Sequence, residues 1–119
     1  LKLNEKRRKI ANYYDKLLKS IKEIKLTKTN NGSSRHLYVI RTKKRNQLIE
    51  HLSKKNVSCI IHYPYSLNKL AAFKNHVRKV RVKNAELWSK QCLSLPIHPN
   101  FSKKNVRKVV KEIKNFFEN

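Results

Sequence analysis

The first part of the chain alternates apolar residues with lysines at a helical spacing. Between Asn4 and Ile24, apolar side chains recur every three or four residues, and lysines occupy the opposite side. This spacing places the apolar residues on one face of an α-helix, so we expect a helix of about 20 residues. The apolar face comprises Ile10, Tyr14, Leu17, Ile21 and Ile24.

A polar connection, a strand and a second helix are predicted next. Residues 26–35, LTKTNNGSSR, hold the only glycine among Thr, Asn and Ser, which is typical of a surface connection. Residues 36–42, HLYVIRT, have the β-branched and aromatic content of a strand. Thr42 stands where a helix N-cap is expected. The helix that follows carries Leu48, Ile49 and Leu52.

A second apolar run ends abruptly at a proline. Residues 57–61, VSCII, are more continuously apolar than the first strand, which predicts a central strand. Pro64 ends this strand because proline cannot donate a hydrogen bond to the ladder. His62 and Tyr63 therefore stand at the C-terminal end of a predicted strand.

The pattern weakens over residues 65–84, where we expect little regular structure apart from a short helical segment between Leu67 and Phe73, followed by a basic loop. Residues 85–92, AELWSKQC, suit a helix of two turns. Residues 93–97, LSLPI, suit a strand that its proline confines to an edge or to a position with a solvent-facing N–H.

The last helix has the strongest pattern. Ser102 is its expected N-cap, and its apolar face comprises Val106, Val109, Val110, Ile113, Phe116 and Phe117. In order, the elements predict an α+β sandwich with a small sheet of about three strands packed with helices. No linker is long enough to divide the chain, so we expect residues 1–119 to form a single domain.

The net charge of +23, from 30 Lys and Arg against 7 Asp and Glu, raises the question of an anionic partner. Arginine, the better phosphate fork, supplies only 8 of these cations, and the chain also has 13 asparagines, so A-rich codons explain much of the excess. The alternative is a stand-alone basic module that binds nucleic acid or acidic protein through the last helix. Its cations there are Lys103, Lys104, Arg107, Lys108, Lys111 and Lys114.

Cysteine usage and hydropathy bear on location. Cys59 and Cys92 lie in apolar stretches without metal-ligand spacing, so we expect both to be reduced, in a cytoplasmic compartment. No apolar run reaches the roughly 20 residues that cross a bilayer, and no signal-type apolar segment follows the N-terminus. The sequence does not begin with Met, which indicates a piece of a longer protein.

Candidate chemistry is sparse. Five of the 7 carboxylates fall in predicted helices among lysines, one glycine cannot form a phosphate loop, and the histidines lack metal-ligand spacing. His62 and Tyr63, held by Pro64, form either a binding pair at a rigid strand end or a purely structural one, with His62 bonded to a carbonyl. His98 fits an extended connector, and His36, His51 and His76 fit solvated positions.

Five motifs in order resemble a known family. NEKRRKIANYY, HLYVIRT with Arg45 just beyond, IIHYP, CLSLPIHP and VRKVVKEIKNFF are similar to the C-terminal domain of the PLP-dependent nucleotide-sugar aminotransferases, the DegT/DnrJ/StrS family. The resemblance implies the small domain of the aspartate aminotransferase (fold type I) superfamily. In that family the Schiff-base lysine, the aspartate on the pyridine nitrogen and the phosphate contacts belong to a large domain, which would precede Leu1.

The resemblance therefore implies part of a transaminase that aminates a keto-sugar nucleotide, for amino-sugar and surface polysaccharide biosynthesis. PLP would be bound by the large domain and not by this chain alone, which would be inactive by itself. A split-gene product and a decayed remnant are the other interpretations that the sequence leaves open. His62, Tyr63 and Pro64 would form the lip of the substrate cleft. Asn68 is the third implied substrate contact, although it and Ser66 stand where the family often has a second histidine and a proline.

The implied partners are the large domain or a second subunit, and the nucleotide sugar. No membrane or nucleic acid is expected among them. The apolar face of the first helix is long for a small sheet to cover, so we expect part of it to stay exposed and to support docking or a homodimer.

Overall fold

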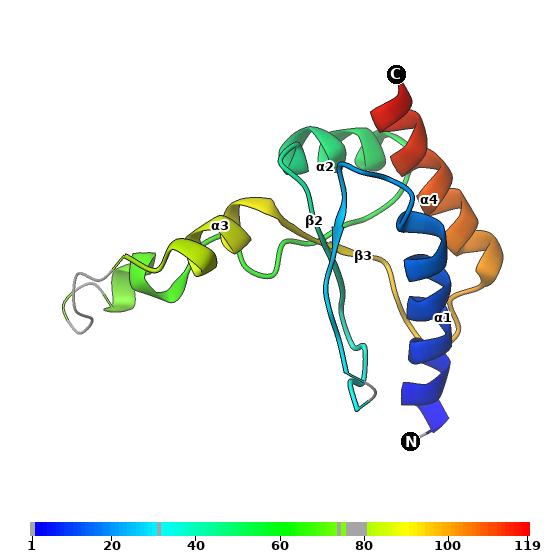
Figure 1. Ribbon diagram of the computed structural model, residues 1–119, viewed down its shortest axis with the longest axis horizontal. Helices are drawn as coiled ribbons and strands as arrows, with labels where there is room; N and C mark the ends of the chain where they lie inside the picture. Colours follow the sequence, from blue (N-terminus) through cyan, green and yellow to red (C-terminus); the bar gives the residue numbers. More distant parts are fainter. Residues whose placement is uncertain (1, 31, 74, 76–80) are drawn as a thin grey trace.

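The fold is α+β, as the sequence predicts. A computed structural model describes residues 2–30, 32–73, 75 and 81–119 (Figure 1). Its helices are α1 (Lys2–Leu18), α2 (Arg45–Lys54), α3 (Lys83–Gln91) and α4 (Lys103–Glu118). Its strands are β1 (Lys25–Leu26), β2 (Tyr38–Arg41) and β3 (Cys92–Leu95), and two short 3-10 helices are η1 (Leu67–Lys69) and η2 (Ala71–Phe73).

The three strands form an antiparallel sheet in the order β1-β2-β3. Tyr38 lies opposite Leu95, and Arg41 lies opposite both Lys25 and Cys92. Strand β3 is at an edge, as its following proline predicts, because Pro96 has no N–H for a further ladder bond.

Helices α1 and α4 lie side by side, and α2 packs against α4 (Figure 1). Tyr38 and Ile40 of the central strand are buried, whereas Val39 and Arg41, which alternate with them, are only partly buried. This alternation is that of a strand with one face on the core. The core also contains Tyr14 and Leu18 of α1 and Val106 and Ile113 of α4.

The N-cap of α4 is confirmed: the Ser102 hydroxyl accepts a hydrogen bond from the backbone N–H of Asn105 at 3.1 Å. Thr42 is not the cap of α2, because Lys44 occupies that position, while the Thr42 hydroxyl accepts from the Lys44 N–H at 3.3 Å. The 26–35 connection is not wholly at the surface either, because Arg35 is buried.

The first helix is shorter than predicted. It ends at Leu18, and the N–H groups of Ile21 and Ile24 then make turn bonds to residues three positions back. Both isoleucines remain buried, because this turn folds back toward the sheet. The expected exposed face is also wrong: Ile10, Tyr14, Ile21 and Ile24 belong to the core cluster, where α4 and the sheet cover them.

The predicted central strand at 57–61 is wrong. The segment makes one isolated bridge, between Ile60 and Ser94, and β2 is the central strand. Its apolar character has two other causes: Val57 is buried in the core and Cys59 packs against it. His51 is likewise not solvated, because it lies between α2 and α4 with its Nε2 3.5 Å from Glu112 Oε2.

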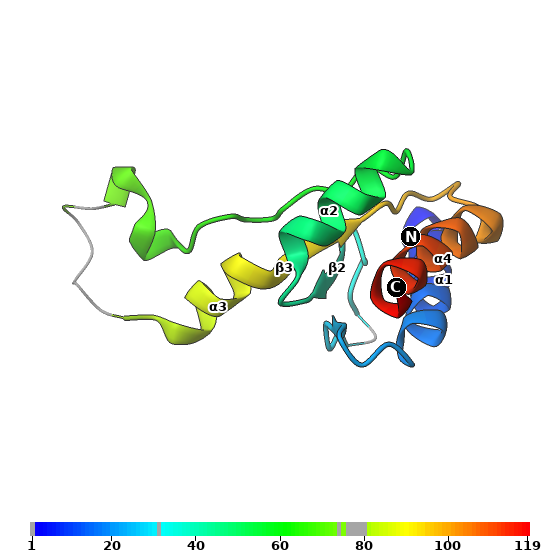
Figure 2. The ribbon, with the colours of Figure 1, turned by 90° about the horizontal axis from the view of Figure 1, so that it is seen from above.

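An extended arm, residues 60–73, 75 and 81–91, projects from the sheet away from α1 and α4 (Figures 1 and 2). It contains η1 and η2, which confirms the short helical segment predicted there, and α3. Within the described residues, seven of the nine exposed large hydrophobic side chains lie in the arm. They are Ile60, Tyr63, Tyr65, Leu67, Phe73, Val82 and Leu87. Most of the basic loop and His76 lie outside the described residues.

The end of α1 gives a test of the core. Leu18 is fully buried, whereas its neighbour Leu17 is only partly buried. We expect Leu18→Ala to lower the free energy of unfolding by about 2–5 kcal/mol and Leu17→Ala by about 1 kcal/mol or less. Urea unfolding of both variants measures the difference, and a larger loss for Leu17→Ala would contradict the position of α1.

Candidate functional site

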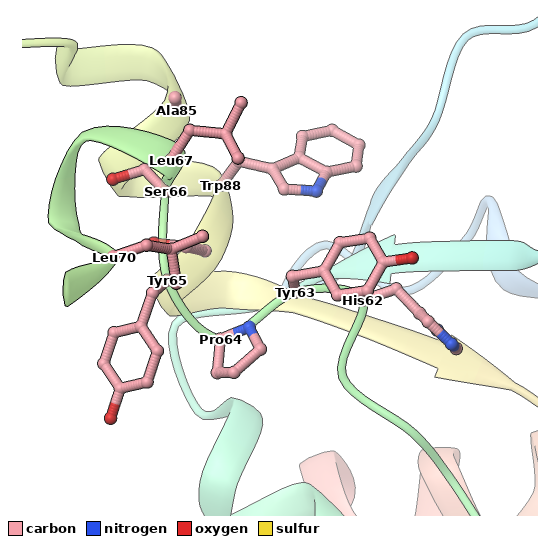
Figure 3. Close-up of a pocket in the computed structure, with 10 residues that line it drawn as sticks. His62, Tyr63, Pro64, Tyr65, Ser66, Leu67, Leu70, Ala85 and Trp88 are labelled. Atoms are coloured by element: carbon pink, nitrogen blue, oxygen red, sulfur yellow. The ribbon is translucent and has the colours of Figure 1, made fainter. Parts of the chain in front are cut away.

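The His62–Pro64 segment is fixed on β3 (Figure 3). Ser94 makes two backbone bonds to Ile60, of 2.8 and 3.2 Å, and its hydroxyl lies 2.8 Å from His62 Nδ1. The Cys92 thiol is 3.5 Å from the His62 carbonyl oxygen and 3.7 Å from that of Tyr63, and donates toward both. The segment is not a strand, but its contacts with Ser94 and Cys92 hold it against β3.

A cavity of about 560 Å³ opens beside this segment. We call it the Tyr63 pocket; it is lined by His62, Tyr63, Pro64, Tyr65, Ser66, Leu67, Leu70, Ala85, Trp88 and Ser89. The Tyr63 side chain is 70% exposed. In Figure 3 the imidazole of His62 points away from Trp88 and toward β3. Apolar and aromatic walls with a few polar groups are typical of a small-molecule pocket.

The structure brings His62 and Tyr63 together, with ring centroids 5.5 Å apart. Asn68 is not among the residues that line the pocket; it lies on η1, and its amide donates to Glu86 Oε1 of α3 at 3.2 Å. That hydrogen bond, with the nearby Lys69 ammonium, holds the pKa of the Glu86 carboxyl below its usual value. In this arrangement Asn68 ties the two sides of the arm together.

Trp88 and Ser94 were missed in the sequence as site residues. Trp88 is the only tryptophan of the chain and lines the pocket. Ser94 could have been found as a polar residue in an otherwise apolar strand that ends beside the His62 motif. Arg45 fixes the junction of α3 and β3, which lies between them in the sequence: its Nη1 donates to the backbone oxygen of Ser89 at 2.7 Å and lies 3.4 Å from that of Cys92.

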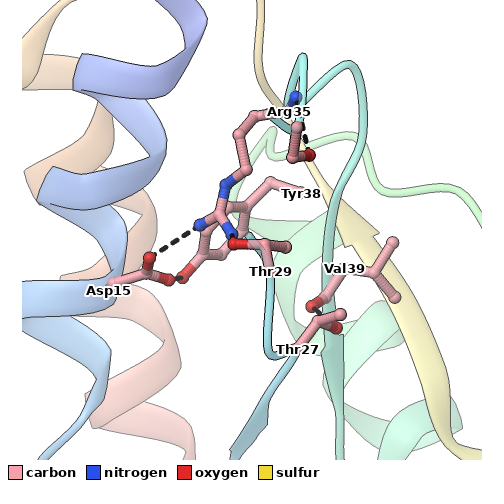
Figure 4. A network of polar contacts seen from close by, with 7 residues as sticks. Asp15, Thr27, Thr29, Arg35, Tyr38 and Val39 are labelled. Atoms are coloured by element: carbon pink, nitrogen blue, oxygen red, sulfur yellow. Dashed lines mark hydrogen bonds and ion pairs between the residues drawn. The ribbon is translucent and has the colours of Figure 1, made fainter. Parts of the chain in front are cut away.

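A polar network fixes the other end of β2 (Figure 4). The carboxylate of Asp15 accepts from Arg35 Nη2 at 2.7 Å and from the Tyr38 hydroxyl at 2.6 Å. Arg35 Nη1 donates to the hydroxyl of Thr29, and the Thr27 hydroxyl donates to the Val39 carbonyl at 2.8 Å. Burial and this carboxylate raise the pKa of Tyr38, so its hydroxyl stays a donor.

Both cysteines are free thiols, as predicted. Burial raises the pKa of Cys59 to about 12 and also raises that of Cys92. No cluster of three or more His, Cys, Asp and Glu in residues 2–30, 32–73, 75 and 81–119 is placed to hold a metal ion. Across the described part of the chain, no helix is long and apolar enough to cross a membrane.

Comparison with known proteins places this fold among the sugar aminotransferases. The family model described as "DegT/DnrJ/EryC1/StrS aminotransferase family" matches residues 2–114, and the chain belongs to this family. The dTDP-3-amino-3,6-dideoxy-alpha-D-galactopyranose transaminase of Aneurinibacillus thermoaerophilus is 31% identical over 117 residues, which are 95% of this chain and 31% of the relative.

Solved structures agree. S. venezuelae DesV in complex with a ketimine intermediate has a TM-score of 0.91 at 26% identity, over 98% of this chain and 32% of DesV. Spr1654 from Streptococcus pneumoniae, in its PMP form, has a TM-score of 0.80 at 27% identity, over 98% of this chain and 31% of that one. The chain thus spans about a third of the length of these relatives.

The family is PLP-dependent, but the residues that the structure describes do not fit a PLP site. Such a site combines a Schiff-base lysine with an acidic or basic partner for the pyridine nitrogen. The only aspartate of the chain, Asp15, is already held by Arg35 and Tyr38. It lies in the network at α1 and not in the Tyr63 pocket.

The contact between Ser94 and His62 gives a second test. We expect Ser94→Ala to leave the fold intact, because the backbone bonds to Ile60 remain, and to lower the free energy of unfolding by about 1 kcal/mol. The imidazole ¹⁵N shifts of His62 should move toward the tautomer mixture of free histidine.

NMR of the ring nitrogens measures this change, with His62→Ala to assign the signals. Ser94→Thr should restore them. The matched control is Ser89→Ala, which removes another buried serine hydroxyl, one that donates to the Glu86 carbonyl oxygen at 2.9 Å. Unchanged His62 shifts in Ser94→Ala would show that the contact does not orient the ring.

Burial of Cys59 predicts a pH dependence. Its thiol has a pKa of about 12 when folded, against about 8.5 in an unfolded chain. Above about pH 8.5 the unfolded state loses this proton and the folded state keeps it, so stability falls as pH rises, by up to ~2 kcal/mol at pH 10. Urea unfolding of the wild type and of Cys59→Ala between about pH 7 and pH 10 isolates this contribution. A difference between the two that does not change with pH would contradict it.

Proposed function

We propose that this chain is the substrate-facing small domain of a PLP-dependent transaminase that transfers an amino group to a keto-sugar nucleotide. The family match over nearly the whole chain, together with its span of about a third of the relatives, carries the proposal. PLP, the Schiff-base lysine and the rest of the active site would lie on a large domain outside this sequence, or on a second subunit. Residues 1–119 would act as one unit, in the cytoplasm, without chemistry of their own.

The arm supports a docking role. Leu67 and Tyr63 are each 70% exposed, and exposed apolar side chains gathered on one segment usually mark an interaction surface. We call the rest of the fold, α1, α2, α4 and the sheet, the body. Its apolar residues form the buried core, so docking of the arm does not require the body to open. The large domain, or a second copy in a dimer, is the proposed partner of the arm.

His62, Tyr63 and Asn68 are the proposed contacts with the nucleotide sugar. Tyr63 offers an exposed phenol at the mouth of a pocket with apolar walls. His62 is held by Ser94 through Nδ1, which leaves Nε2 as its second ring nitrogen for a ligand. Asn68 would have to exchange its bond to Glu86 for one to the substrate.

The alternative, a basic nucleic-acid-binding module, is not favoured. The relatives that the chain resembles are transaminases. Two of the cations on α4 also have structural contacts: Lys103 lies over the Tyr13 ring, 5.5 Å from its centroid, and Arg107 donates to the Tyr13 hydroxyl at 3.2 Å.

A chimera tests the proposal. In the chimera, this chain would replace the matching C-terminal part of the A. thermoaerophilus transaminase. Amino transfer would be measured with dTDP-3-amino-3,6-dideoxy-alpha-D-galactopyranose, the amino-sugar nucleotide in that enzyme's name. We expect turnover by the chimera, and a loss of about tenfold in kcat/KM for Tyr63→Ala because one substrate contact disappears.

Two matched variants separate binding from docking. His98→Ala removes an exposed ring that packs on Phe101 and should change nothing. Leu67→Asp should leave the stability of the 119-residue chain unchanged and weaken assembly of the chimera, because Leu67 has no core contact to lose. A chimera that turns over equally well with Tyr63→Ala would reject the assigned substrate contact, and one that folds without any turnover would reject the proposed function.

A further inference from the structure

A second large cavity lies on the other side of α3 from the Tyr63 pocket. Its volume is about 520 Å³. We call it the basic cleft; it is lined by Lys22, Glu23, Lys25, Arg41, Thr42, Lys43, Lys44, Leu87, Gln91 and Phe117. From α3 it receives Leu87 and Gln91, whereas the Tyr63 pocket receives Ala85, Trp88 and Ser89. The two cavities share no lining residue.

The basic cleft gathers cations without compensating them. Five come from three separate stretches: the turn after α1, strand β1, and the end of β2 with the turn that follows. Glu23 is the one carboxylate in the lining. Among the described residues, none of the five cations forms an ion pair. The ion pairs found within the described residues lie elsewhere in the molecule.

Among these five cations, Arg41 is held by an aromatic contact with Trp88. Its guanidinium carbon lies 5.1 Å from the centroid of the Trp88 ring, and the side chain is partly buried. Stacking of this kind holds the planar guanidinium in place. Arginine has five N–H donors that suit a phosphate or carboxylate. In the described part of the chain no acceptor engages those of Arg41.

The sheet register places two positive charges opposite each other. Lys25 and Arg41 lie directly opposite each other on β1 and β2. Side chains of directly opposed residues share one face of the sheet, and like charges in such a pair are destabilising. An anion between them would turn this repulsion into attraction.

We propose that the basic cleft binds an organic phosphate, with the phosphate groups between Lys25 and Arg41 and an apolar or ring-bearing portion against Leu87 and Phe117. A phosphate neutralises more of the five positive charges than a carboxylate does and matches the arginine fork. Leu87 is 46% exposed, so the cleft has an apolar wall that inorganic phosphate would not use. This site is separate from the substrate contacts proposed at Tyr63.

Trp88 provides the readout, because it is the only tryptophan and Arg41 lies over its ring. The 119-residue chain would be titrated with ADP, with pyrophosphate and with adenosine at constant ionic strength. We expect ADP to change the fluorescence with the highest affinity, pyrophosphate to bind more weakly, and adenosine not to bind. Equal affinity for ADP and pyrophosphate would show that only the inorganic portion is recognised and would overturn the organic part of the proposal.

Variants test whether the binding is local. Arg41→Gln should weaken ADP binding at least about tenfold, the value of one charge-assisted hydrogen bond. Arg41→Lys keeps the charge but loses the guanidinium fork, so its affinity for ADP should lie between those of the wild type and Arg41→Gln. Glu23→Gln should tighten binding, because it removes the one opposing charge from the cleft.

Matched variants make the same charge changes elsewhere. Lys104→Gln on α4 and Glu5→Gln at the start of α1 should leave ADP affinity within about twofold, since surface charges contribute little. Substitution of Arg41 removes its contact with Trp88 and could abolish the fluorescence signal without abolishing binding. ADP affinity of the wild type and of every variant is therefore also measured by isothermal titration calorimetry, which does not depend on Trp88. An equal loss for Arg41→Gln and Lys104→Gln would overturn the site in favour of diffuse attraction to a cationic surface.

Discussion

The stack of Tyr14 on Tyr38 joins the helical layer to the sheet, and the candidate site depends on it. Their ring centroids lie 4.6 Å apart, and both side chains are buried. The Tyr14 hydroxyl donates to the Pro96 carbonyl at 3.0 Å, and the Tyr38 hydroxyl donates to Asp15. Burial raises the pKa of both phenols, so both remain donors. Helix α1, strand β2 and the end of β3 are thereby fixed together, and β3 is the strand that carries the contacts to His62.

The body is stabilised by burial of apolar side chains, whereas the arm is stabilised mainly by hydrogen bonds. The body places its apolar residues between helices and sheet, whereas only Ser66 and Ser89 are buried among the described residues of the arm. The arm keeps its shape through short turn bonds and through the hydrogen bonds of Arg45 to the carbonyls where α3 meets β3. A segment of this kind gains little from burial within the chain, so its apolar surface has a use only against something outside it.

The sequence predicted elements whose local pattern and packing agree. Helix α4 has a cap at Ser102 and an apolar face that the core accepts, so the prediction was right. The 57–61 segment was misjudged because β-branched residues indicate burial as readily as pairing, and here Val57 enters the core while only Ile60 pairs. Of the site, the pairing of His62 with Tyr63 was predictable from adjacency. The contacts from Ser94 and Trp88 were not, because the fold brings them from 26 to 32 residues away along the sequence.

Three of the seven carboxylates tie separate parts of the fold together. Asp15 holds Arg35, Glu86 holds the arm through Asn68 and Lys69, and Glu112 lies against His51 between two helices. Most cations in the described part of the chain are exposed, and charges on the surface are screened beyond about 10 Å at ordinary salt. The basic cleft is the exception, because the fold itself brings its cations together there, with Lys25 opposite Arg41. Repulsion is concentrated at that place, so the folded state gains more from an anion there than from one bound anywhere along the lysine-rich faces of the helices.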